Sequence, residues 1–127
     1  MKQLKKEKRQ LIHQKYNGRC AYCGDKLEYS KMHVDHIIPL YRRWTNLELE
    51  KYGKVKGSGK IDNLMPSCQT CNLSKSTFTL DVWKEQICLK INRLRRDSSS
   101  FRLIEKFNLI KVKNSDIIFY FEKNMKL

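Results

Sequence analysis

The spacing of apolar residues predicts a helix at each of two well-separated places in the chain. Residues 2–17 place apolar side chains on one helical face among many basic ones, and Gly18 suits the position just after the helix end. Residues 79–96 form the clearest helical pattern, with apolar residues every three or four positions: Leu80, Trp83, Ile87, Ile91 and Leu94. Basic side chains in the last turn of this second segment suit the negative end of the helix dipole.

Between these helices, shorter patterns predict a mixed structure. Residues 19–40 contain a cysteine knuckle, a short hairpin and a strand at 32–36, and Pro39 ends regular pairing because it lacks an amide donor. A short helix over 44–52 follows. The next stretch, GKVKGSGK, is rich in glycine and lysine, which predicts an exposed basic loop.

The remaining segments complete an α+β pattern. Residues 61–67 are extended, and 68–76 begin with a second knuckle that becomes one or two helical turns. After a break at 97–100, we expect a short helix over 101–107 and then a terminal hairpin, LIKVK with IIFYFEK, around 114–116. This apolar hairpin would either cover the chain's own core or pair edge to edge with a second chain. The length of 127 residues predicts a single domain.

The charge of the chain indicates a polyanionic partner. Lys and Arg total 27 against 13 Asp and Glu, a formal net charge of +14, and such a basic excess favours nucleic acid. A membrane surface also attracts basic chains, but no apolar run approaches the ~18 residues of a spanning helix. The N-terminus lacks the apolar core of a signal peptide. We therefore expect an intracellular, cytoplasmic protein with no membrane partner.

Four of the five cysteines form two C-x-x-C pairs, Cys20 with Cys23 and Cys68 with Cys71. In a chain without an export signal, cysteines stay reduced and are available to metals. Two such pairs indicate a tetrahedral four-thiolate zinc site, and the long segment between them must be a structured insert. Cys88 is left over, and its place in an apolar helical stripe predicts a core residue.

The stretch MHVDHIIPL places His33, Asp35 and His36 within an otherwise apolar run. Asp35 and His36 are adjacent, so they would point to opposite faces of a regular strand and share one site only where the strand ends or bends. Pro39 supplies a reason for such a bend. A carboxylate can hold a hard cation while a neutral imidazole takes a proton from water, which suits metal-assisted hydrolysis.

These residues carry a family resemblance. VDHIIPL, followed by IDNLMPSCQTCNLSK, resembles the signature of the HNH endonucleases that have a four-cysteine zinc site, over roughly residues 18–76. The flanking segments resemble those of small stand-alone HNH proteins common in phage genomes. The resemblance implies a ββα-metal fold, in which two strands and a helix hold one divalent cation, Mg²⁺ or Mn²⁺, and a structural zinc braces them. It also implies a prokaryotic or phage-infected host.

The resemblance also implies a role for each matching residue. Asp35 matches the aspartate ligand of the catalytic cation and His36 the general base. Asn63 matches the asparagine that orients the loop bearing the base, and Asn72 supplies a second metal ligand. Lys75 matches a basic residue placed to meet a phosphate.

The implied activity is cleavage of DNA, leaving 5′-phosphate and 3′-hydroxyl ends, by a monomer or a homodimer on DNA. The segment 41–60 is longer than the compact family pattern needs, which makes it a candidate element for contacting DNA or a partner. We expect phosphate contacts from a group of basic residues in it: Arg42, Arg43, Lys54, Lys56 and Lys60. Two alternatives remain open, a non-catalytic zinc-ribbon module that binds DNA and a nuclease that acts on RNA.

Overall fold

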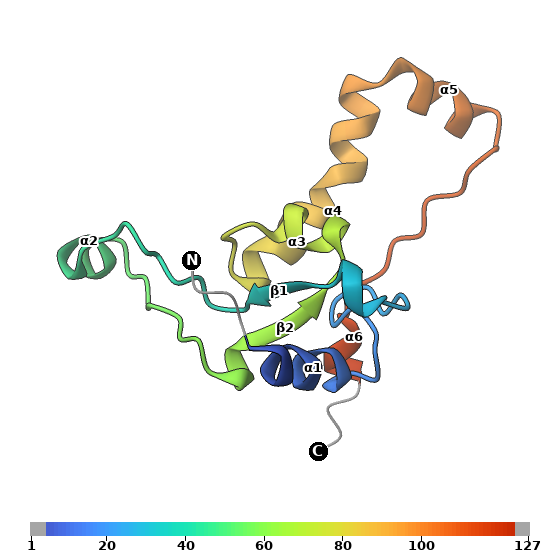
Figure 1. Ribbon diagram of the computed structural model, residues 1–127. Helices are drawn as coiled ribbons and strands as arrows, with labels where there is room; N and C mark the ends of the chain where they lie inside the picture. Colours follow the sequence, from blue (N-terminus) through green and yellow to red (C-terminus); the bar gives the residue numbers. More distant parts are fainter. Residues whose placement is uncertain (1–4, 124–127) are drawn as a thin grey trace. The chain divides into compact units, whose positions relative to one another are not determined.

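The computed structural model describes residues 5–123 (Figure 1). The described chain forms two compact units. The first contains the residues up to Leu80 together with those from Ile118 onward, and the second is Asp81–Ile117. Residues 2–4 of the predicted N-terminal helix lie outside the described part. None of the described helices is both long and apolar enough to cross a membrane.

A two-stranded antiparallel sheet lies at the centre of the first unit (Figure 1). Strands β1 (His33–His36) and β2 (Leu64–Ser67) pair so that His33 lies opposite Ser67 and His36 opposite Leu64. Helix α1 (Lys6–Gln14) contacts β2, and α3 (Gln69–Lys75) contacts β1. This unit also contains α2 (Asn46–Lys51) and three other short elements: the 3-10 helices Tyr29–Lys31 and Ile61–Asn63, and α6 (Tyr120–Lys123). The strand predicted over 32–36 is confirmed.

One cluster of the core joins α1 to the sheet. Ile12 from α1 packs with Leu27, Met32 and Leu64, and Val34 and Cys68 lie against this cluster. Burying one such aliphatic side chain contributes about 1.5–3 kcal/mol. A domain of this size has a modest stability margin, which a metal-bound cluster of cysteines can increase.

The segment between the strands contains helix α2 (Asn46–Lys51), which confirms the short helix predicted over 44–52. Thr45 and Glu48 form a capping box in which each side chain accepts from the other's backbone amide, at 3.1 Å in both directions. Residues 53–60 form no regular element, as predicted, but Gly57 is held against the end of β1. Its amide donates to the Pro39 carbonyl at 2.8 Å.

The second unit consists of helices joined by a sharp break. Helix α4 (Leu80–Asp97) confirms the prediction over 79–96, and α5 (Ser99–Lys106) that over 101–107. The Ser98 hydroxyl caps α5 by accepting from the Phe101 amide at 3.1 Å. Arg95 and Glu105 join the two helices through a two-pronged ion pair.

The prediction that Cys88 is a core residue is wrong, because Cys88 is exposed. The buried residue of α4 is Trp83. Five residues later a helix has turned about 140° away, so that Cys88 lies on a different face.

The predicted terminal hairpin is also wrong. Residues 110–119 contain no strand, and the chain then forms α6. The apolar segment binds the first cysteine knuckle instead: Phe121 donates its amide to the Ala21 carbonyl at 2.8 Å, and Tyr120 to that of Tyr22 at 3.0 Å. Phe119 and Phe121 are buried. The segment therefore covers the chain's own interior, and two of its backbone amides bond to the first knuckle.

Candidate active site and metal centre

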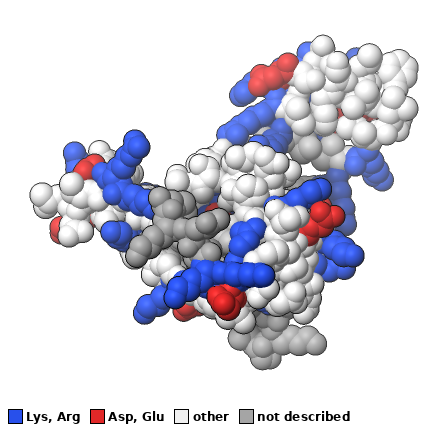
Figure 2. All heavy atoms as spheres, in the orientation of Figure 1, with Lys and Arg blue, Asp and Glu red and all other residues white. Residues whose placement is uncertain are grey.

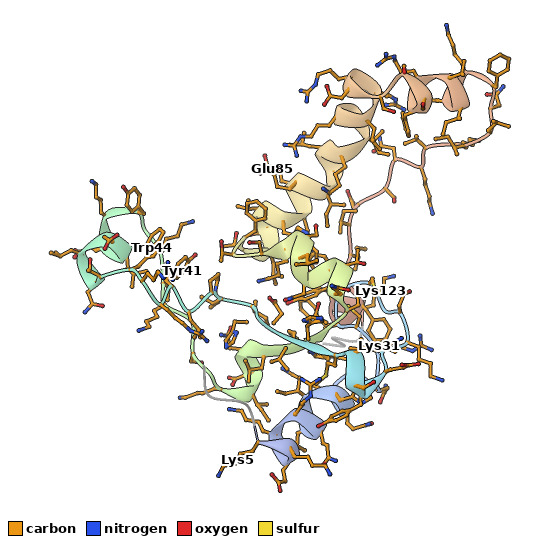
Figure 3. The ribbon with its side chains drawn as sticks, turned by 45° about the horizontal axis from the view of Figure 1, so that its top comes forward. Lys5, Lys31, Tyr41, Trp44, Glu85 and Lys123 are labelled. Atoms are coloured by element: carbon orange, nitrogen blue, oxygen red, sulfur yellow. The ribbon has the colours of Figure 1, made fainter. Side chains whose placement is uncertain are left out.

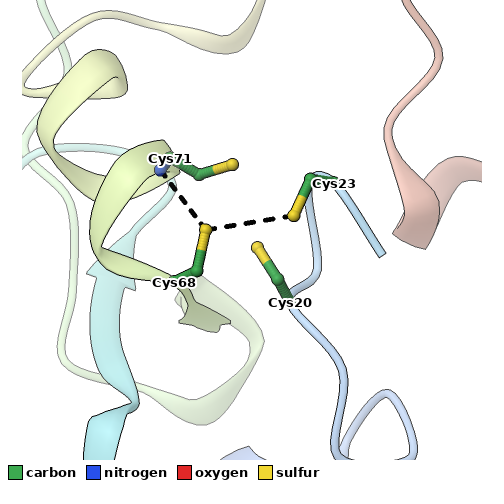
Figure 4. A group of neighbouring side chains, drawn as sticks. All are labelled: Cys20, Cys23, Cys68 and Cys71. Atoms are coloured by element: carbon green, nitrogen blue, oxygen red, sulfur yellow. Dashed lines mark hydrogen bonds between the residues drawn. The ribbon is translucent and has the colours of Figure 1, made fainter. Parts of the chain in front are cut away.

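The two cysteine knuckles meet in the first unit (Figure 4). The first is a tight turn closed by a bond from the Gly24 amide to the Cys20 carbonyl at 3.0 Å. Gly24 has φ +80°, a left-handed conformation that glycine adopts without strain. The second knuckle opens α3, where the Cys68 sulfur caps the helix by accepting from the Cys71 amide.

The four sulfur atoms fit a tetrahedral metal. All lie within 4.8 Å of one another, and sulfurs on a tetrahedral zinc at 2.3 Å would be about 3.8 Å apart. A small contraction around a cation would close the site, and four thiolates are a donor set that structural zinc takes. Four protein ligands leave no coordination position for water or substrate.

The cysteines share their protons unequally. A hydrogen bond with Cys71 lowers the pKa of Cys20 to about 4, and the same bond raises the pKa of Cys71. Burial raises the pKa of Cys23 to about 12. A metal must displace the remaining protons, so its affinity for this cluster falls in acid.

A second site lies at the end of β1. A hollow of about 470 Å³ is lined by Asp35 and His36 from the strand, by Asn72 from the first turn of α3, and by the chain from Pro39 to Trp44. The structure thus brings together three of the residue types that a metal-dependent hydrolase needs. His33 is exposed and lines a different hollow, beside Cys68.

Asn63 fixes the chain that leaves β1. Its side-chain oxygen accepts from the Ile38 amide at 2.9 Å, and its amide group donates to the carbonyls of Ile38 at 3.1 Å and Ser58 at 2.7 Å. Its own carbonyl accepts from the Ile37 amide at 3.0 Å. These bonds hold the residues directly after His36, which orients the strand end.

Gly57 completes this junction and was not identified from the sequence. A Cβ atom at Gly57 would lie 1.8 Å from the Ile38 carbonyl oxygen, a distance that no side chain can occupy. The turn formed by Ile38, Asn63 and Gly57 therefore requires glycine. Its only signal in the sequence is a glycine in a glycine-rich loop, which does not distinguish it from Gly59, where a Cβ would meet nothing within 4 Å.

The Asp35 carboxylate is buried and held by two donors on one oxygen. The Tyr22 hydroxyl donates to Oδ2 at 2.5 Å, and the Lys75 ammonium lies 3.1 Å from the same atom. Burial raises the pKa of Tyr22 far above its usual range, and the negative charge of Asp35 adds to this effect. Tyr22 therefore stays protonated and acts as a donor.

The expectation that Lys75 meets a phosphate is wrong. Its side chain is fully buried, and its ammonium group donates to the His36 carbonyl at 2.9 Å besides pairing with Asp35. A buried ammonium group needs a counter-charge, because an unpaired one costs several kcal/mol. Asp35 supplies that charge, and Lys75 in turn connects α3 to both residues at the end of β1.

His36 is half-buried at the mouth of the hollow. Burial lowers its pKa below the usual value. The Asp35 charge raises it, while the positive charges of Arg42, Lys75 and Lys8 lower it again. The net lowering favours the neutral imidazole, the form that can accept a proton, at neutral pH.

The segment after Pro39 presents basic and aromatic side chains beside this hollow. Tyr41 turns the chain in a left-handed conformation with φ +48°, and its ring lies 4.9 Å from that of Trp44 (Figure 3). Arg42 and Arg43 line the hollow and are exposed. Lys54, Lys56 and Lys60 are exposed farther along, and Figure 2 shows Lys and Arg side chains projecting from this insert.

Part of this chain matches a known protein family. The profile that matches is that of the HNH endonuclease family, over residues 20–78. A protein from the SPbeta prophage of Bacillus subtilis named as an HNH endonuclease, YoqL, is 31% identical over 71% of this chain and 34% of its own length. The CRISPR-associated endonuclease Cas9 of Corynebacterium diphtheriae is 27% identical over 61% of this chain.

The chain spans about a third of the prophage protein and 6% of that Cas9. Among solved structures, the Type II-C Cas9 of Actinomyces naeslundii matches with a TM-score of 0.48 and 22% identity, over 78% of this chain and 10% of that one. The family match covers both knuckles, both strands and α3. Residues 20–78 of this chain therefore resemble a domain of the HNH endonuclease family.

Proposed function

We propose that this protein is an HNH endonuclease that hydrolyses phosphodiester bonds in DNA with a divalent cation. The observation that carries the proposal is the single hollow that Asp35, His36 and Asn72 line together, with Arg42 and Arg43 at its side. We propose that the described chain acts as one nuclease domain, of which the second unit is a part.

Asp35 and Asn72 are the residues we assign to the cation. A carboxylate and a carboxamide oxygen suit Mg²⁺ or Mn²⁺, which keep water on the positions that the protein leaves open. Because the donors from Tyr22 and Lys75 both use Oδ2 of Asp35, Oδ1 is the oxygen we assign to the cation. When bound, the cation would neutralise phosphate charge and stabilise the leaving oxygen.

His36 is the residue we assign as the general base. It would take a proton from the attacking water, and its lowered pKa keeps it ready to do so at neutral pH. Asn63 acts as a positioning residue, because it holds the backbone that follows His36. Arg42 and Arg43 would bind the phosphate beside the hollow.

DNA is the substrate that the family and the charge favour. Four thiolates and one zinc change the formal charge by −2, so a charge of about +12 remains on the chain of net charge +14. Lys54, Lys56 and Lys60 on the insert would contact the DNA backbone. A structural zinc on the four cysteines would hold the two knuckles together.

Cleavage of supercoiled plasmid tests the proposal. The zinc-loaded protein should nick the plasmid when Mg²⁺ or Mn²⁺ is added and leave it intact in EDTA at a concentration that spares the zinc. Binding without cleavage at every cation concentration would indicate a zinc-dependent binding module. Faster cleavage of a structured RNA than of duplex DNA would change the substrate and keep the chemistry.

A further inference from the structure

The Tyr22 side chain is held rigidly inside the first knuckle. Tyr22 lies between the ligands Cys20 and Cys23, and only 3% of its surface is exposed. Its ring meets those of Phe119 and Phe121 edge to face, with centroids 5.3 and 6.1 Å away. Packing therefore sets where the hydroxyl group lies, and the position of the ring follows the knuckle.

The hydroxyl group contributes one of two donors to the same oxygen. Tyr22 donates to Oδ2 of Asp35 at 2.5 Å, while the Lys75 ammonium lies 3.1 Å from that atom. Two donors from different directions fix the rotation of a carboxylate as well as its place. The Asp35 side chain is 7% exposed, so water competes little with these donors.

The two donors come from the two halves of the zinc site. Tyr22 belongs to the first knuckle, and Lys75 lies one helical turn after Cys71 of the second. A metal that joins the knuckles therefore also sets the distance between the donors. The position of the Asp35 carboxylate therefore depends on the four cysteines, through the two donors that the knuckles place.

We propose that Tyr22 is a positioning residue for the divalent cation, through which the zinc knuckle controls the orientation of Asp35. By holding Oδ2, the hydroxyl group leaves Oδ1 for the cation. This inference rests on the proposed function. It assigns to Tyr22 a second role besides packing within the zinc knuckle.

Loss of the hydroxyl group has a defined consequence. The Asp35 carboxylate could then rotate and share both oxygens with the Lys75 ammonium, which competes with the cation. Removing a residue that orients a metal ligand typically costs 10- to 100-fold in metal affinity or activity. We expect Tyr22→Phe to bind the cation about tenfold more weakly or worse, and excess cation to restore most of the cleavage rate.

The test compares three zinc-loaded, full-length proteins: the parent, Tyr22→Phe and Tyr29→Phe. Tyr29→Phe makes the same chemical change on the short helix Tyr29–Lys31, where the Tyr29 ring packs against His13 and Arg9. Electron paramagnetic resonance of free Mn²⁺ gives the Kd without any reaction, and single-turnover plasmid cleavage across a Mg²⁺ titration gives the half-saturating concentration and the maximal rate. Zinc content and circular dichroism are measured for each protein.

The expected result is an increase in both the Mn²⁺ Kd and the half-saturating Mg²⁺ concentration for Tyr22→Phe alone, with zinc content unchanged. A Kd equal to that of the parent would overturn the inference. So would loss of zinc or of the folded signal, because the hydroxyl group would then serve the fold. If the parent itself neither bound Mn²⁺ nor cleaved, the proposed function would fail, which is a separate outcome.

Discussion

At the scale of single residues, the side chain and the backbone of His36 have separate roles. We assign the imidazole to the chemical step, whereas the backbone carbonyl accepts a structural hydrogen bond. Lys75 binds the His36 carbonyl, and alanine would keep that bond. We expect His36→Ala to retain zinc, fold and DNA affinity but to cleave about 10²- to 10⁴-fold more slowly in single-turnover reactions, the contribution typical of a general base. A folded His36→Ala protein that cleaved at nearly the parent rate would remove His36 from the mechanism.

Asp35 combines a catalytic and a structural task. Removing one partner of a buried ion pair typically costs 3–5 kcal/mol, whereas replacing both is often close to neutral. We expect Asp35→Asn and Lys75→Met each to lower the free energy of unfolding in urea, and the double variant to regain much of that loss. Mn²⁺ binding should stay lost in the double variant, because the anionic ligand is gone. Strictly additive losses in stability would show that the pair is not coupled.

At the scale of elements, the junction between β1 and the insert depends on Gly57. A methyl group there would displace the Ile38 carbonyl, so Gly57→Ala should lower the free energy of unfolding by about 1–3 kcal/mol. The cleavage rate should fall by up to about 10²-fold, because a shift of 1 Å can cost that much. The matched control is Gly59→Ala, which has room for the methyl group and should behave as the parent. Equal behaviour of both variants would contradict this role.

The same elements show what could be predicted from the sequence. Strand β1, α2 and α4 follow from local patterns. Asp35 and His36 stand out from their apolar neighbours by their chemistry, whereas Asn72 is indicated only by the resemblance to the HNH endonucleases. Tyr22 and Gly57 could not be found, since their roles depend on contacts with residues 13 or more positions away. The resemblance assigns Lys75 to a phosphate, and only the structure reveals its buried partner Asp35. The terminal segment was predicted as a hairpin because alternating apolar residues do not specify what they pack against.

At the scale of the whole molecule, the net charge of +14 should dominate the affinity for duplex DNA. If several Lys and Arg side chains replace counterions on the DNA backbone, affinity falls log-linearly with salt, by about 0.9 decade per phosphate contact for each decade of salt. Fluorescence anisotropy with duplex DNA, measured from about 50 mM to about 200 mM salt, gives the slope. Replacing Lys54, Lys56 and Lys60 together should reduce this slope by the amount expected for about three phosphate contacts. A flat response would mean that the charge serves another partner.

The pairing of α6 with the first knuckle also bears on how the chain acquires its structure during synthesis. The ribosome releases Tyr22 early, whereas the segment that supplies Phe119 and Phe121 follows roughly a hundred positions later, and contacts so distant in sequence form slowly. Until then the ring of Tyr22 lacks its aromatic cover. A nascent chain that has released all four cysteines but not this segment would therefore lack the packing that fixes Tyr22, and we expect it to bind the divalent cation more weakly than the finished protein.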